Sequence, residues 1–129
     1  VHLPGFDPNP YAYMTQADLF VLSSRFEGSP NALKEALALG TPVVATDCRS
    51  GPGQILQNGR YGPLVPVEDP QALAEAMEQG LASPPDRQAL PRAVSKYTLR
   101  ASSRAYLREL GLEPSASEDE VHTMDARRD

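Results

Sequence analysis

The sequence predicts an α/β fold of the Rossmann-like type, in which helices flank a parallel sheet. Two short apolar runs, 19–23 and 43–46, are rich in strand formers and have the pattern of strands buried on both faces of a parallel sheet. A helical pattern from 30 to 39 lies between them, as in a strand–helix–strand crossover. We expect parallel strands near 1–3, 19–23, 43–46 and 64–65.

The helix over 30–39 has start and stop signals. Gly28 is predicted to give the preceding turn its freedom in φ, and Ser29 is a favourable N-cap. Pro30 suits the first helical position, and Gly40 falls where a helix ends. The turn therefore leads from the carboxyl end of a strand directly into the start of a helix.

Further helices are predicted after the strand at 64–65. Asp69 caps a helix from Pro70 to about residue 81, with a stripe at helical spacing that faces the core. A helix that contains Pro91 follows the break at 83–85, and an amphipathic helix over 98–110 ends at Gly111. The stripe consists of Leu73, Ala74, Met77 and Leu81.

The start of the helix over 30–39 offers an anion-binding site. Its N-terminal N–H groups and partial positive charge allow the amides of Asn31, Ala32 and Leu33 to receive a diphosphate. Glu27 precedes the helix and Glu35 lies just over one turn inside it, so the two carboxylates flank the same opening. Ionised carboxylates accept hydrogen bonds from vicinal hydroxyls.

Each of these features also has an ordinary structural explanation. A carboxylate near a helix N-terminus is favoured by the helix dipole without any ligand, and Asn31 is equally typical of capping. The glycine-rich turn at 47–53 either borders a pocket or simply connects two elements. Cys48 has no histidine near it in the motif, which favours a buried packing role.

The order and spacing of several segments resemble one known family over residues 1–110. Glu27 and Glu35, with seven residues between them, are followed by ALALGTPVVAT at 36–46 and SGPGQIL at 50–56. NPYAYM at 9–14 leads into ADLFVLSS at 17–24, and NGRYGPLVP at 58–66 leads into DPQALA at 69–74. The chain thereby resembles the donor-binding, carboxy-terminal domain of retaining glycosyltransferases of the GT-B fold, family four, the "group 1" glycosyltransferases.

The resemblance implies a role for each residue of the motif. Glu27 would bind hydroxyls of the donor sugar in the catalytic site, and Glu35 would take the ribose hydroxyls of the nucleotide. Gln54 stands where the family usually has Glu, so a role at that position stays open. Donor sugar and phosphate would be held by the turn and the helix start that follow Glu27, namely Gly28, Ser29, Asn31, Ala32 and Leu33.

The implied reaction is transfer of a sugar from a nucleoside-diphosphate sugar to a sugar or lipid acceptor with retention of configuration. The donor is the substrate, and no further cofactor or metal is expected. The amino-terminal GT-B domain, the diphosphate-neutralising basic residues and the nucleobase pocket are expected outside these residues, together with any peripheral membrane contact. The alternative is a non-catalytic sugar-nucleotide-binding or interaction module.

Composition sets the remaining expectations. The net charge is −5, of which residues 113–129 hold −4, so we expect a folded part over 1–112 and an acidic disordered tail over 113–129. The rest of the chain has no basic patch, which argues against nucleic acid as a partner. One cysteine rules out an internal disulfide and is typical of a cytoplasmic protein, and two histidines without metal-ligand spacing argue against a metal site.

Overall fold

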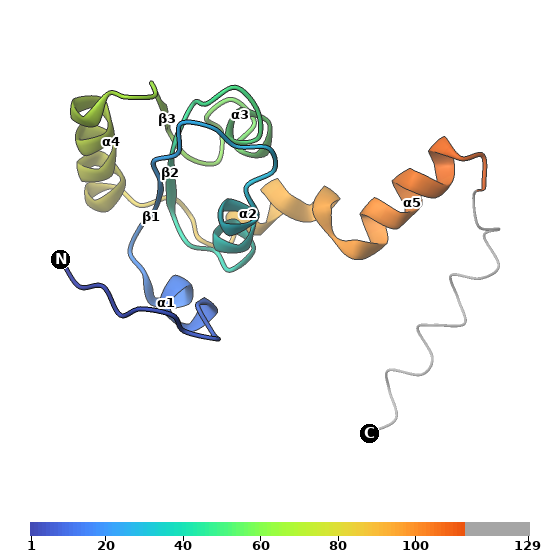
Figure 1. Cartoon of the computed structure of the whole chain (residues 1–129), viewed down its shortest axis with the longest axis horizontal. Coiled ribbons are helices and arrows are strands. Elements are labelled where there is room, and N and C mark those ends of the chain that lie inside the picture. Colours follow the sequence, from blue (N-terminus) through green and yellow to red (C-terminus); the bar gives the residue numbers. More distant parts are fainter. Residues whose placement is uncertain (113–129) are drawn as a thin grey trace. The chain divides into compact units, whose positions relative to one another are not determined.

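The computed structural model describes residues 1–112 and divides the chain into two units, Val1–Ser95 and a second that begins at Lys96. The acidic tail predicted for 113–129 lies outside the described residues. Figure 1 shows the elements in chain order. These are α1 (Tyr11–Gln16), β1 (Phe20–Leu22), α2 (Asn31–Ala38), β2 (Val43–Thr46), α3 (Pro52–Ile55), β3 (Leu64–Val65), α4 (Pro70–Ala82), the 3-10 helix η1 (Leu90–Tyr97) and α5 (Leu99–Glu109).

The first unit is built on a parallel sheet with the strand order β1-β2-β3. Val21 pairs with Val44 across the first ladder, and Thr46 pairs with Val65 across the second. In Figure 1, α2 and α3 lie on one side of the strands and α4 lies on the other. This arrangement confirms the predicted Rossmann-like α/β class with helices on both faces.

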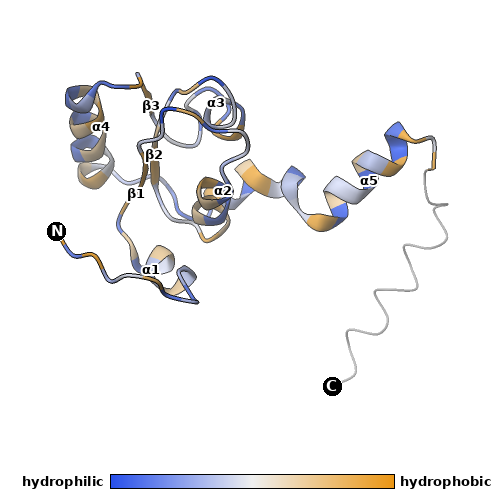
Figure 2. Cartoon of the chain, in the orientation of Figure 1, coloured by the Kyte–Doolittle hydropathy of each residue, from blue (hydrophilic) through white to orange (hydrophobic). Residues whose placement is uncertain are grey.

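The core is centred on β2, whose four residues are all buried. Val44, Val65 and Ala76 form a buried cluster in which α4 covers the sheet, and Leu19 and Leu73 pack against it. Figure 2 shows the apolar residues concentrated along the three strands. The residues of β1 are only half-buried, contrary to the prediction for 19–23, because this strand lies at the edge of the sheet.

The predicted strand at 1–3 is wrong. Val1 and Leu3 lie in an irregular segment and are highly exposed. A strand forms only where a neighbour completes its ladder, and within residues 1–112 β1 pairs with β2 alone. The segment instead leads into α1, a short helix that the sequence did not predict.

The later helices agree with the prediction more closely. The Asp69 Oδ1 atom accepts a hydrogen bond from the Ala72 amide at 2.9 Å, which confirms the predicted cap of α4. The predicted core stripe is partly wrong, because Ala76 is the buried residue of α4 while Ala74 and Leu81 are exposed.

The predicted helix over 98–110 and its end at Gly111 are confirmed, and Thr98 is an N-cap that was not predicted. Thr98 accepts a hydrogen bond from the Ala101 amide at 3.2 Å, and Gly111 has a left-handed φ of 70° just beyond the helix. The segment around Pro91 forms η1, a 3-10 helix in place of a regular helix.

Candidate functional site

The loops that leave the three strands meet at the carboxyl edge of the sheet. They comprise residues 23–30 after β1, 47–51 after β2 and 66–69 after β3. The Asp47 amide donates to the Val65 carbonyl at 2.7 Å, and the Arg25 Nε atom lies 3.2 Å from the Glu68 Oε1 atom. Ligands of open parallel sheets bind at this edge, and Glu27 lies in the first of these loops.

Glu27 is held at both its side chain and its main chain. The Ser24 hydroxyl donates to the Glu27 Oε1 atom at 2.7 Å, and the Ser50 hydroxyl donates to the Glu27 carbonyl at 2.8 Å. The buried Thr46 hydroxyl donates to the Ser24 carbonyl, which ties this loop to the end of β2. The sequence analysis did not predict these contacts of Ser24 and Ser50 with Glu27. The spacing of three residues between Ser24 and Glu27 is the signal that could have indicated the first contact.

The start of α2 differs from the prediction. Pro30 is the N-cap residue, with an extended ψ of 99°, so the helix begins at Asn31 and no side chain caps it. Ser29 is therefore not the cap, and its hydroxyl instead accepts a hydrogen bond from the Lys34 ammonium at 2.9 Å. Sequence reasoning missed Lys34. It lies one turn inside α2, so its side chain can reach the turn that precedes the helix.

The first amides of α2 take no part in the helical hydrogen bonds. The first helical hydrogen bond runs from the Lys34 amide to the Pro30 carbonyl, so the amides of Asn31, Ala32 and Leu33 precede the helical ladder. Leu33 is completely buried, its amide included, so the predicted phosphate contact at Leu33 is wrong and only the amides of Asn31 and Ala32 remain accessible to a ligand. Glu35 lies in the second turn of the helix and is half-buried.

The predicted need for φ freedom at Gly28 is wrong, and a second glycine, Gly51, has the left-handed conformation instead. Gly28 does not adopt a left-handed φ, and a Cβ atom placed on it meets nothing within 4 Å. Gly51 in the neighbouring loop has a φ of 92°, and a Cβ there would lie 2.6 Å from the Pro30 Cδ atom. The loop after β2 therefore packs directly against the loop that carries Glu27.

The remaining candidate residues contribute little to this site. Gln54 is exposed on the four-residue α3, and Cys48 is a free, buried thiol, as predicted for a packing residue. Among residues 1–112 no group of His, Cys, Asp and Glu side chains could hold a metal ion. No helix in that part of the chain is both long and apolar enough to cross a membrane.

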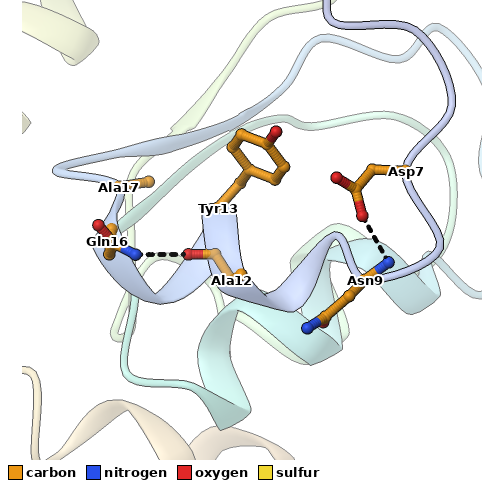
Figure 3. Close-up of a pocket in the computed structure, with 6 residues that line it drawn as sticks. All are labelled: Asp7, Asn9, Ala12, Tyr13, Gln16 and Ala17. Atoms are coloured by element: carbon orange, nitrogen blue, oxygen red, sulfur yellow. Dashed lines mark hydrogen bonds between the residues drawn. The ribbon is translucent and has the colours of Figure 1, made fainter.

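A separate hollow of about 510 Å³ lies beside α1 (Figure 3). Within its lining, the Asn9 main-chain N–H donates to the Asp7 Oδ1 atom at 2.7 Å and the Gln16 side chain donates to the Ala12 carbonyl at 3.3 Å. Ala17 precedes β1, which places the hollow at the amino edge of the sheet, away from Glu27. Its lining contains no cation that could pair with a phosphate.

Comparisons with known proteins point to one family. A family model described as glycosyl transferases group 1 matches residues 1–83. The chain is 38% identical over 105 residues, 81% of its length, to the N-acetylgalactosamine-N,N'-diacetylbacillosaminyl-diphospho-undecaprenol 4-alpha-N-acetylgalactosaminyltransferase of Campylobacter jejuni. It is 31% identical over 119 residues, 88% of its length, to the lipopolysaccharide core biosynthesis glycosyltransferase LpsE of Rhizobium meliloti.

A third relative is the amylovoran biosynthesis glycosyltransferase AmsK of Erwinia amylovora, which is 40% identical over 82 residues, or 57% of this chain. All three relatives are much longer than the matched region. The match covers 27% of the Campylobacter protein, 35% of LpsE and 20% of AmsK.

Proposed function

The chain belongs to the group 1 glycosyl transferases, and from this we propose that it is the donor-binding part of a longer glycosyltransferase. The whole protein would transfer a sugar from a nucleoside diphosphate to an acceptor with retention of configuration. The observation that carries this proposal is Glu27, whose carboxylate is fixed by Ser24 in the loop that precedes the α2 N-terminus.

The proposed division of labour follows the position of each group. Glu27 lies on the loop and accepts hydrogen bonds from hydroxyls of the sugar, whereas Glu35 lies inside the helix and accepts those of the ribose. The turn amides of Gly28 and Ser29 and the helix amides of 31–32 hold the phosphates between them. The open space beside the Gly28 Cα atom supports close approach of a ligand, because the fold itself does not require glycine there.

The chemical contribution of these residues is electrostatic. Transfer breaks the bond between the anomeric carbon and the diphosphate oxygen, and negative charge develops on the leaving diphosphate. The α2 N-terminus stabilises that charge, and the Lys34 ammonium, which contacts Ser29 in the same turn, adds a full positive charge nearby. No side chain of this part needs to act as a base.

The names of the relatives support a proposal for the acceptor. The name of the Campylobacter relative gives an acceptor linked to diphospho-undecaprenol, and LpsE is named for lipopolysaccharide core synthesis. We propose a sugar or lipid-linked acceptor in polysaccharide or glycolipid synthesis. The enzyme would work in the cytoplasm at the inner face of the membrane, with acceptor and membrane contacts provided by an amino-terminal GT-B domain.

The test separates the two carboxylates in the full-length protein. Glu35→Ala should weaken binding of the free nucleoside diphosphate by about 1.5 to 3 kcal/mol, the range for hydrogen bonds to a charged group. Glu27→Gln should leave that affinity unchanged and reduce sugar transfer. Glu78→Ala, on the exposed face of α4, is the matched control. Equal loss of nucleotide affinity in both variants, measured by titration calorimetry, would contradict the assignment.

The isolated chain should transfer no sugar. A helix N-terminus contributes about 0.3–1 kcal/mol per charge near the surface, whereas micromolar binding requires ~8 kcal/mol. Transfer also requires an acceptor held at the anomeric carbon. Incubation of the purified chain with radiolabelled nucleotide sugars and a lysate as acceptor source is the direct measurement, and reproducible transfer would show that the site is more complete than proposed.

A non-catalytic sugar-nucleotide-binding module is the second candidate. It is favoured by Gln54, which lacks the charge of the Glu usual at this position and lies exposed on α3. Full-length protein that binds nucleotide sugars without transferring or hydrolysing them, and that gains transfer activity in the Gln54→Glu variant, would establish this alternative.

A further inference from the structure

We propose that Ser24 is a positioning residue, which orients the Glu27 carboxylate toward the sugar of the donor. The inference rests on the proposed role of Glu27 as a ligand of that sugar. Its basis is the hydrogen bond of 2.7 Å from the Ser24 hydroxyl to the Glu27 Oε1 atom, which is part-buried and spans three residues of the loop after β1.

The bond fixes a side chain that would otherwise have several rotamers. A glutamate on a loop loses conformational freedom when a ligand immobilises it, and this lowers the affinity. Ser24 imposes that order before the ligand arrives. A carboxylate has about four acceptor positions, so the single bond to Oε1 leaves both oxygens able to accept sugar hydroxyls.

Ser24 can orient Glu27 because its own backbone is anchored in the core. The Thr46 hydroxyl, at the end of β2 and only 4% exposed, donates to the Ser24 carbonyl and lies 3.3 Å from the Leu22 carbonyl. Thr46 thus links the carboxyl end of β1 to the end of β2 through its side chain. The serine hydroxyl then projects from a rigid base and not from a mobile loop.

A second serine supports Glu27 from the neighbouring loop. The Ser50 hydroxyl donates to the Glu27 carbonyl at 2.8 Å, across 23 residues of sequence. Its partner is the main chain, so Ser50 holds the position of Glu27 while Ser24 holds the direction of its carboxylate. The two serines therefore support the same residue through two independent hydrogen bonds.

The experiment is a double-mutant cycle in the full-length protein with Ser24→Ala, Glu27→Ala and both together. The probe is the member of a panel of UDP- and GDP-linked hexoses and N-acetylhexosamines that the wild-type protein transfers. Ser24→Ala should lower kcat/KM for that donor about 10- to 100-fold while the affinity for the free nucleoside diphosphate and the melting temperature stay unchanged. Ser24→Thr, which keeps the hydroxyl, should restore most of the activity.

The decisive comparison is made in the Glu27→Ala background, where Ser24→Ala should cause no further loss of donor affinity in titration calorimetry. An equal loss in both backgrounds would show a merely structural role and overturn the proposal, as would wild-type kinetics of Ser24→Ala. Wild-type transfer by Glu27→Ala would instead overturn the proposed role of Glu27 itself.

Two further variants protect the test against misfolding. Ser23→Ala changes the adjacent exposed serine and should behave as wild type. Ser50→Ala removes the exposed support and should lower kcat/KM for the donor without changing nucleotide affinity. If Ser24→Ala lowers the melting temperature, its kinetics no longer separate positioning from folding, and Ser50→Ala becomes the test. Wild-type kinetics of Ser50→Ala would then overturn the proposal that the two serines position Glu27.

Discussion

Replacement of Gly51 by alanine would perturb the loop of Glu27 without touching Glu27. Gly51 is buried and has a φ of 92°, which an L residue adopts at a cost of about 1–3 kcal/mol. The new Cβ atom would also lie 2.6 Å from the Pro30 Cδ atom and 3.3 Å from the Gly28 carbonyl oxygen. Such overpacking typically adds about 1–3 kcal/mol, for a total destabilisation of about 2–6 kcal/mol.

This loss is large compared with the ~5–15 kcal/mol that stabilises a typical domain. Urea unfolding followed by circular dichroism measures it, and Gly53→Ala is the matched control. Gly53 lies in α3 without a left-handed φ, and its Cβ atom would approach only the Asp47 Oδ1 atom, at 3.4 Å. The control should be neutral or slightly stabilising. If Gly51→Ala were as stable as Gly53→Ala, the inferred contact between the two loops would be wrong.

Three further substitutions test individual interactions. Asp69→Ala removes the cap of α4 and should reduce the free energy of unfolding by about 1 kcal/mol, with Asp69→Asn as a control that retains a capping oxygen. Leu33→Ala creates a cavity beneath α2 and should cost about 2–5 kcal/mol in urea unfolding, and a cost below 1 kcal/mol would contradict its burial. Arg25→Ala breaks an exposed ion pair with Glu68 and should change the melting temperature little, whereas a large drop would show that the pair is shielded from solvent and stabilises the fold.

The sequence predicted the central strand β2 correctly because its local pattern and its environment agree. The apolar run of β2 is buried on both faces in the structure, as its composition indicated. Val1 and Leu3 have the same local character but no ladder partner in residues 1–112, so they stay irregular and exposed. Pairing is a property of the neighbouring strand, and a single-sequence pattern does not contain it.

The hydrogen bonds of the site also depend on neighbours that a local sequence pattern does not specify. The position of Glu27 on a loop and of Glu35 in a helix followed from glycine and proline signals around residue 30. The hydrogen bond from Ser50 to the Glu27 carbonyl depends on the packing of two loops, which no local signal specifies. The error at Ser29 has a local cause, because the extended Pro30 took the N-cap position and moved the helix start by one residue.

The position of β1 at the edge of the sheet has a consequence for handling the purified chain. In the described part of the protein, one side of Phe20–Leu22 pairs with β2 while the other side has no neighbouring strand. An open edge of this kind is a template for addition of a strand from another molecule. Concentrated solutions of the chain should therefore associate edge to edge, with light scattering that rises steeply with concentration.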